Sequence, residues 1–343
     1  MNVLRSTSLL LACLPLLSTS CVLDRSATAD CSEGVPCRLQ ELGEGPFDDG
    51  SVDPESESDA GNPTSADAAT LNPFLADAGA GEPLPGPDPG RLPKVTGSCP
   101  EFSEGSATFK GSNVRLWVGS DGESKRGPLV FYWYSNEGDA SEVMHALGAG
   151  VIAEIKQLGG MVAALEKSTR EGVSTGTTSW STGDYAVADE VVACAIAKGV
   201  GIDSARIHAV GFGAGGLHSS WMAYARSSYL ASVVAYSGGL TSSWRTSSVT
   251  EDANNVVPAM LVHGKLGADR YLYDFSLTSS AMVSDIAERG GFALDCEHSL
   301  GHNIPDGVGG SALRFLLDHP YKQSPSPYRT AIPSSFPSYC KVP

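Results

Sequence analysis

Runs of hydrophobic residues divide the chain from about residue 110 onward into short strand-like and longer helix-like segments. The strand-like runs are five or six residues long and rich in Val, Ile, Leu and aromatic residues, which is typical of buried strands in a parallel sheet. We predict strands at Val114–Val118, Leu129–Tyr134, Met161–Leu165, Arg206–Val210, Ala231–Tyr236, Ala259–His263 and Phe292–Cys296.

Between these runs, apolar residues recur every three or four positions, which predicts helices. We place helices at 141–158, 185–198, 275–289 and 307–317, and another after the glycine-rich turn 211–216. Asp184 is the expected N-cap of the second helix. Strands that alternate with helices predict an α/β fold, with a mostly parallel central sheet and helices on both faces.

The first 20 residues have the features of an export signal. Arg5 supplies a positive charge, Leu9–Leu17 is apolar, and small residues follow at Ser18–Ser20. Cys21 comes next, and the arrangement resembles a bacterial lipoprotein signal in which this cysteine is lipidated. We therefore expect 1–20 to be a signal peptide and the mature protein to be a lipoprotein of the outer membrane or periplasm. Secretion without an anchor is the alternative.

Charge separates a tether from a folded domain. Residues 22–93 hold 15 acidic and three basic residues, whereas the chain from Lys94 onward holds 24 acidic and 19 basic ones. The acidic part is poor in large apolar residues, so it cannot bury enough surface to offset the entropy of ordering. We predict a disordered linker at 38–93 and one folded domain at 94–343. Nothing is basic enough to suggest a nucleic-acid partner.

The cysteines fit an oxidising compartment. Setting aside Cys13 in the signal and Cys21 as the anchor leaves an even number, which suggests disulfides. Six cysteines allow 15 connectivities. The pairing we favour joins neighbours within 21–37 and ties the ends of the folded domain, giving Cys31–Cys37, Cys99–Cys340 and Cys194–Cys296. No CxxC pattern occurs, and no metal site or cofactor is expected.

The turn Gly211–Gly216 matches two known patterns. It satisfies the dinucleotide fingerprint Gly-x-Gly-x-x-Gly, but that site needs an acid at the end of the next strand, and this strand ends in Tyr236-Ser237-Gly238. Its place between a strand and a helix also suits the nucleophile elbow Gly-x-Ser-x-Gly, although the central residue here is glycine. Asp269 and then His302 follow the later strands, which is the order of acid and histidine in hydrolases of this type.

Four segments together resemble one branch of the secreted α/β-hydrolases, the polyhydroxybutyrate depolymerases and feruloyl-esterase-like proteins. The likeness covers about residues 110–318, and its segments are 206–216, 236–239, 258–264 and Gly301-His302. The elbow of that family reads Gly-Phe-Ser-Ala-Gly-Gly. The resemblance therefore places Gly213 where the serine nucleophile belongs.

The same resemblance assigns the other site positions. Asp269 takes the place of the triad acid, with Asp274 as the second choice, and His302 that of the base. The family carries His-Gly in the oxyanion loop after the third strand, whereas this chain has Tyr134-Ser135-Asn136. The N–H of Ala214 can still serve as an oxyanion donor, and His218 is expected to line the same pocket.

Glycine has no side-chain atom with which to form an acyl-enzyme. It also relaxes a turn that normally stores about 1–3 kcal/mol of strain. The leading hypothesis is therefore an anchored hydrolase homologue without serine catalysis that has a binding or structural role, with a small ester or polymer-like molecule as its candidate ligand.

Two alternatives remain open. One is an active carboxylesterase that uses an activated water or a displaced nucleophile, for which Ser219, Ser220 and Ser237 are the candidates. The other is a nucleotide-binding protein that uses the glycine-rich turn.

Overall fold

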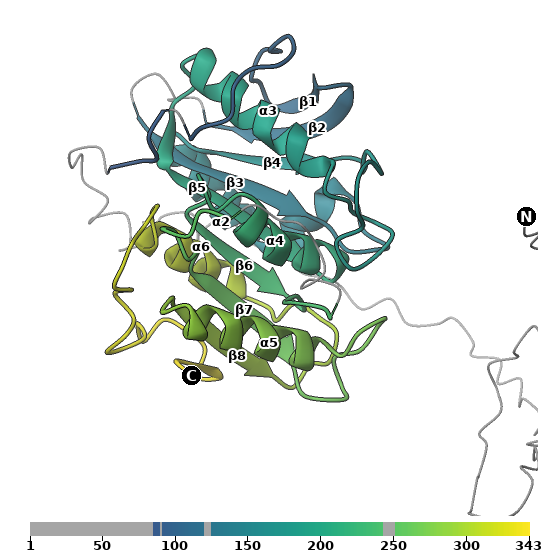
Figure 1. Cartoon of the computed structure of the whole chain (residues 1–343), viewed down its shortest axis with the longest axis vertical. Coiled ribbons are helices and arrows are strands. Elements are labelled where there is room, and N and C mark those ends of the chain that lie inside the picture. Colours follow the sequence, from purple (N-terminus) through teal and green to yellow (C-terminus); the bar gives the residue numbers. More distant parts are fainter. Residues whose placement is uncertain (1–84, 90, 120–124, 243–250) are drawn as a thin grey trace, which may run out of the picture. The chain divides into compact units, whose positions relative to one another are not determined.

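The computed structural model describes residues 85–89, 91–119, 125–242 and 251–343. Within these ranges it contains one nine-stranded sheet (Figure 1). The strands are β1 (Gly105–Phe109), β2 (Ser112–Val118), β3 (Gly127–Trp133), β4 (Met161–Leu165), β5 (Ile202–Phe212), β6 (Ser232–Tyr236), β7 (Ala259–Gly264), β8 (Ala293–His298) and β9 (Cys340–Lys341). The helices are the 3-10 turn η2 (Ala140–Glu142), α1 (Val143–Ala146), α2 (Ala149–Gln157), α3 (Asp184–Ala197), α4 (Ala214–Ala225), α5 (Phe275–Glu288) and α6 (Val308–Asp318).

The sheet is parallel through its centre and antiparallel at both edges. Its strand order is β1-β2-β4-β3-β5-β6-β7-β8-β9. The strands from β4 to β8 in this order run parallel, whereas β1, β2 and β9 pair antiparallel with their neighbours. The predicted α/β class with a mostly parallel sheet is therefore confirmed.

Helices cover both faces of the sheet and create two hydrophobic cores. One core lies under α3, α4 and α5, and the other lies under α1, α2 and α6, on the opposite face in Figure 1. Strand β3 shows why both form: Leu129, Phe131 and Trp133 point into the first core, and Val130 and Tyr132 into the second. Because side chains alternate across a strand, a strand buried on both faces reads as a continuous apolar run.

All seven predicted strands are present, but the helix predicted at 141–158 is divided. It forms as η2, α1 and α2, with the break at Gly148, whose φ of 89° lies outside the range of a right-handed helix. The edge strands β1 and β9 were not predicted. Strand β1 is only partly buried and β9 has two residues, so neither carries a continuous apolar run.

Asp184 was predicted as an N-cap, but it is the first residue of α3, and Gly183 is the cap. The Asp184 carboxylate binds backward to the loop before the helix. It accepts hydrogen bonds from the N–H of Thr169 at 2.6 Å and the N–H of Ser181 at 2.8 Å. Its role is to fasten this loop to the helix start.

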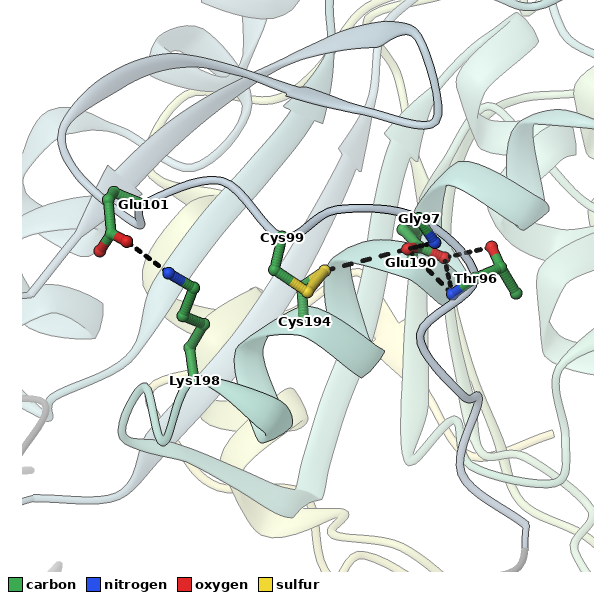
Figure 2. The surroundings of a disulfide bond; sticks show 7 residues. All are labelled: Thr96, Gly97, Cys99, Glu101, Glu190, Cys194 and Lys198. Carbon is green, nitrogen blue, oxygen red and sulfur yellow. Dashed lines mark hydrogen bonds and ion pairs between the residues drawn. A yellow bond between two sulfur atoms is a disulfide. The ribbon is translucent and has the colours of Figure 1, made fainter.

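The predicted pairings of the domain cysteines are wrong. The structure joins Cys99 to Cys194 and Cys296 to Cys340. Cys296 lies directly opposite Cys340 in the antiparallel β8–β9 pair, and the segment before β1 crosses α3 at Cys194 (Figure 2). Both bridges follow from contacts that sequence spacing does not reveal.

The segment before β1 is held to α3 by polar contacts next to the disulfide. The Glu190 carboxylate accepts hydrogen bonds from the N–H groups of Thr96 and Gly97 and from the Thr96 hydroxyl (Figure 2). Lys198 pairs with Glu101 one turn beyond Cys194. The bridge and these contacts together fix the start of the domain.

Packed structure begins several residues before Lys94, the start predicted for the domain. Pro87 is buried, and Arg91 forms an ion pair with Asp252. The signal, the lipidation site Cys21, the pair Cys31–Cys37 and most of the linker at 38–93 lie outside the described residues. In the part of the chain that the structure describes, no helix is long and apolar enough to span a bilayer.

Candidate active site

A tight turn between β5 and α4 forms the centre of the site. Gly213 is the N-cap of α4 and has φ 56° and ψ −112°, in the left-handed region that residues with side chains rarely adopt. Its N–H donates to the carbonyl of Tyr236 at 2.9 Å. A Cβ at Gly211 or Gly215 would lie 2.2 Å or less from a backbone oxygen, so the turn can close only with glycine at both positions.

His302 and Asp269 form a hydrogen-bonded pair beside this turn. Nδ1 of His302 lies 2.7 Å from Oδ1 of Asp269. The other oxygen of Asp269 accepts the N–H of Gly264 at 2.8 Å and the hydroxyl of Ser237 at 2.9 Å. Asp269 is fully buried and its carboxylate is bound on both sides, so it holds the imidazole with Nδ1–H directed at itself. Nε2 is thereby left as a hydrogen-bond acceptor.

Nε2 of His302 faces the position of the missing side chain. A Cβ built on Gly213 would lie 3.3 Å from this nitrogen and 3.5 Å from Cβ of Ser135. A side chain at this position would therefore be in close contact with the imidazole, whose Cε1 is also 3.5 Å away. Gly213, His302 and Asp269 are arranged like the three positions of a hydrolase triad, with no side chain at the first.

Aromatic rings hold the imidazole in place. The His302 ring stacks on Phe212 with centroids 4.7 Å apart, and on Phe275 with centroids 4.9 Å apart. Tyr271 lies parallel to it at 6.3 Å. These rings leave the histidine little freedom to turn away from Gly213.

A cavity of ≈ 160 Å³ opens above the turn. Its walls come from the carboxyl ends of β3, β4, β5, β7 and β8 and the segments that follow them, where ligands bind in open α/β sheets. The lining residues are Ser135, Asn136, Glu137, Thr177, Phe212, Gly213, Ala214, Tyr271, Leu272, Phe275 and His302.

The loop that would supply an oxyanion donor is bound to a carboxylate instead. The N–H of Ser135 donates to Oε1 of Glu142 at 3.0 Å, and its hydroxyl donates to Oε2 at 2.5 Å. The Tyr132 hydroxyl donates to Oε1 at 2.7 Å, and its pKa is raised well above the ordinary value by burial and then by the charge of Glu142. Both Ser135 donors are therefore engaged by an anion.

The structure brings some of the predicted site residues together. Gly213, Ala214, Ser135 and His302 line the cavity, and Asp269 supports His302 from behind. Asp274, the second choice for the acid, is the N-cap of α5 and accepts the N–H of Ser276. The geometry thus favours Asp269 as the partner of the histidine.

Two predicted pocket residues, Tyr134 and His218, do not line the cavity. The carbonyl of Tyr134 accepts a hydrogen bond from Nε1–H of Trp180 at 2.8 Å, and the Tyr134 hydroxyl donates to the carbonyl of Glu166. His218 is fully buried, stacks on Tyr185 at 4.2 Å and has Nδ1 2.8 Å from the Thr175 hydroxyl. Its side chain packs in the core between α3 and α4, and burial holds its pKa well below the usual value.

The serines considered as displaced nucleophiles have structural contacts. All three are fully buried. Ser220 donates to the carbonyl of Gly216 and accepts the N–H of Gly239. Ser237 donates to Asp269, and Ser219 lies against the elbow near Gly211. None of the three lines the cavity.

Sequence reasoning missed Glu142 and the aromatic wall formed by Phe212, Tyr271 and Phe275. Phe212 stands within the elbow motif, so its contact with the histidine follows from the resemblance once that motif is recognised. Glu142 gives no local signal, since it reaches the site only because η2 folds back onto the end of β3.

The sequence matches no protein-family model and no curated protein. Solved structures resemble the chain through its fold. Native pOPH superposes with a TM-score of 0.54 and 16% identity over 71% of this chain and 96% of its own. Native sOPH superposes with a TM-score of 0.52 and 16% identity, over 74% of this chain and 97% of its own. The DMSO complex of a pOPH variant superposes with a TM-score of 0.55 and 16% identity, over 71% of this chain and 95% of its own. With the sheet topology, these likenesses show the α/β-hydrolase fold.

Proposed function

We propose that this protein has an α/β-hydrolase fold, has lost serine catalysis, and binds a small molecule in the cavity above Gly213. The observation that carries the proposal is the glycine at the centre of the elbow. A Cβ built on Gly213 would lie 3.3 Å from Nε2 of His302, where a serine nucleophile would be expected. A glycine cannot form an acyl-enzyme. In a serine hydrolase, loss of the nucleophile lowers turnover by about 10⁶.

The condition of the oxyanion loop supports the same proposal. Stabilisation of a tetrahedral intermediate needs free donors directed at the developing charge, and one such donor contributes about 10²–10³ to turnover. Here the N–H of Ser135 already donates to Glu142. A carboxylate next to the developing oxyanion would oppose it, so a nucleophile alone would give poor catalysis.

The cavity and its supports are nevertheless retained, and a binding role accounts for this. Asp269 still orients His302, and the aromatic wall still surrounds the imidazole. The resemblance to depolymerases and esterases suggests a small ester or polymer-like molecule as the ligand.

A second candidate function is hydrolysis by directly activated water. The intact His302–Asp269 pair favours it, because Nε2 is an acceptor that faces the cavity. The burial of Ser219, Ser220 and Ser237 argues against the version that uses a displaced serine.

A serine-directed fluorophosphonate probe, used together with a nitrophenyl ester, tests the loss of serine catalysis. We expect the purified wild-type protein to remain unlabelled and to hydrolyse the ester no faster than a His302→Ala control. A labelled serine peptide would establish a displaced nucleophile. Hydrolysis without labelling that disappears in the control would establish activated water.

We also propose that the protein is exported and anchored through a lipid on Cys21, which keeps the folded domain at the cell envelope. The expected result is that the wild type requires detergent for extraction, whereas Cys21→Ala is released into the soluble exported fraction. Cys13→Ala, within the signal, is the matched control and should remain anchored. A wild-type protein found wholly in the soluble exported fraction would contradict the anchor.

A further inference from the structure

We propose that the ligand of this cavity carries an alcohol group that lies over Gly213 and donates a hydrogen bond to Nε2 of His302. The inference rests on the proposed binding function and names the chemistry that the site selects. A neutral hydroxyl beside an apolar group fits the cavity walls, and a carboxylate does not.

The first step is the direction of the hydrogen bond at His302. Its Nδ1–H is directed at Asp269, whose second oxygen is occupied by the donors of Gly264 and Ser237. The carboxylate cannot turn away without leaving buried donors unpaired, which carries a large free-energy cost. The imidazole therefore presents an acceptor to the cavity, and its partner must be a donor.

The second step is the space above Gly213. In a serine hydrolase this space holds a CH₂OH group, whose hydroxyl donates to the histidine. Here a Cβ would lie 3.3 Å from Nε2 and 3.5 Å from Cβ of Ser135, so no side chain stands between Gly213 and the imidazole. A ligand is not bonded to Cα, so its carbon must lie farther from Gly213 than a serine Cβ would. Its hydroxyl can still approach over the bare glycine and donate to Nε2, as a serine hydroxyl does.

The third step is the polarity of the opposite wall. Ser135 gives both of its donors to Glu142, so this residue offers no donor to a bound anion. The exposed side chain of Glu137 adds a carboxylate to the lining. A bound anion would meet these charges in addition to that of Asp269. Backbone N–H groups in the first turn of α4, at Ala214, remain as donors to the oxygen of an alcohol.

The fourth step is the apolar part of the ligand. Phe212, Phe275 and Tyr271 lie nearly parallel to the imidazole, and all three line the cavity together with Leu272. Tyr271 is 56% exposed and Leu272 is 65% exposed, so these apolar side chains have surface available for a ligand. An alcohol on a ring or short apolar chain would use both features.

Three small probes that share one ring test the proposal. Benzyl alcohol, benzyl methyl ether and benzoate differ only in the head group, which is respectively a donor, an acceptor without a proton, and an anion. Titrations followed by calorimetry should give a Kd for benzyl alcohol at least about tenfold below those of the other two. Benzyl alcohol should also shift the ¹⁵N resonance of His302 Nε2. Equal or tighter binding of the ether or of benzoate would overturn the proposal.

A pair of glycine variants locates the binding. Gly213→Ser fills the space with the protein's own hydroxymethyl group, and we expect at least about tenfold weaker binding of benzyl alcohol. Gly199→Ser is the matched control: Gly199 also has a positive φ, of 68°, but it follows α3, outside the cavity lining, and has no heavy atom within 4 Å of a built Cβ. It should bind like the wild type. Unchanged binding by Gly213→Ser would contradict the inference.

Failure of this inference is separable from failure of the proposed function. Ester hydrolysis by the wild type would contradict the loss of catalysis, whatever the order of the probes. An unreactive wild type that binds benzoate best would leave the loss of catalysis intact and contradict only the alcohol assignment.

Discussion

Gly213 retains the backbone conformation of a nucleophile elbow although it carries no nucleophile. Its φ of 56° and ψ of −112° would strain any other residue, and we expected glycine to relax the turn. The structure shows that the turn keeps this shape with glycine in place, and glycine adopts a positive φ without the steric penalty of a side chain. The surrounding contacts maintain that shape, in particular the hydrogen bond from its N–H to Tyr236 and the close approach of Gly211 to Gly215.

A Gly213→Ala substitution measures this strain directly. We expect the free energy of unfolding to fall by about 1–3 kcal/mol in urea denaturation, because alanine must adopt a positive φ. Gly150→Ala, at an open position in α2, is the matched control and should leave stability unchanged or raise it by up to about 1 kcal/mol. Equal effects of the two substitutions would show that the turn is not strained.

Buried histidines make stability depend on pH. Burial, followed by the charges of Arg206 and His319, lowers the pKa of His208 to about 3, and burial lowers that of His319 to about 4. An unfolded histidine takes up a proton near pH 6.5 whereas the folded ones remain neutral, so in this window the unfolded state binds more protons. Stability should therefore fall as the pH is lowered from about 6.5 to 4.

The replacement of one histidine tests this origin. Each of the two buried histidines should change the free energy of unfolding by up to about 1.4 kcal/mol per pH unit between about pH 6.5 and pH 4. His208→Asn can keep the hydrogen bond to Ser232 and cannot be protonated in this range, so denaturation series should show a shallower dependence on pH. An unchanged slope would mean that other groups dominate.

At the scale of elements, the sequence predicts the strands and helices that have a local hydrophobic pattern. It does not predict contacts between segments that meet only in the folded chain. The seven continuous strands and the turn into α4 carry strong local signals, and each is present. Glu142 reaches Ser135 because η2 folds back onto the end of β3, and no local pattern indicates this contact. The cysteine pairing depends likewise on β9, a strand too short to recognise.

The Cys99–Cys194 bridge ties an element that precedes the sheet to α3 across 95 residues. Replacing both cysteines with serine should lower the free energy of unfolding by about 2–5 kcal/mol, because the unfolded chain gains the freedom of a long loop. Peptide mapping without reduction should recover Cys99 with Cys194 and Cys296 with Cys340. Recovery of Cys99 with Cys340 would contradict the assignment, as would full stability of the double variant.

At the scale of the whole molecule, the folded unit includes residues that the charge pattern assigned to the linker. The acidic composition of 38–93 hides this, because the contacts of Pro87 and Arg91 are tertiary. A chain that starts at residue 85 should therefore be more stable than one that starts at residue 94, by about 1–2 kcal/mol in urea denaturation. Equal stability would restore the boundary at Lys94.

In the proposed function, one absent side chain, at Gly213, separates this site from that of a serine hydrolase. The most direct measurement is kcat/KM for a short-chain nitrophenyl ester with the wild type, Gly213→Ser, and Gly213→Ser combined with His302→Ala. We predict no activity for the wild type, weak activity for the serine variant because Glu142 still occupies the Ser135 N–H, and none for the double variant. Turnover by the wild type equal to that of Gly213→Ser, or a folded Gly213→Ser protein with no activity, would contradict the account.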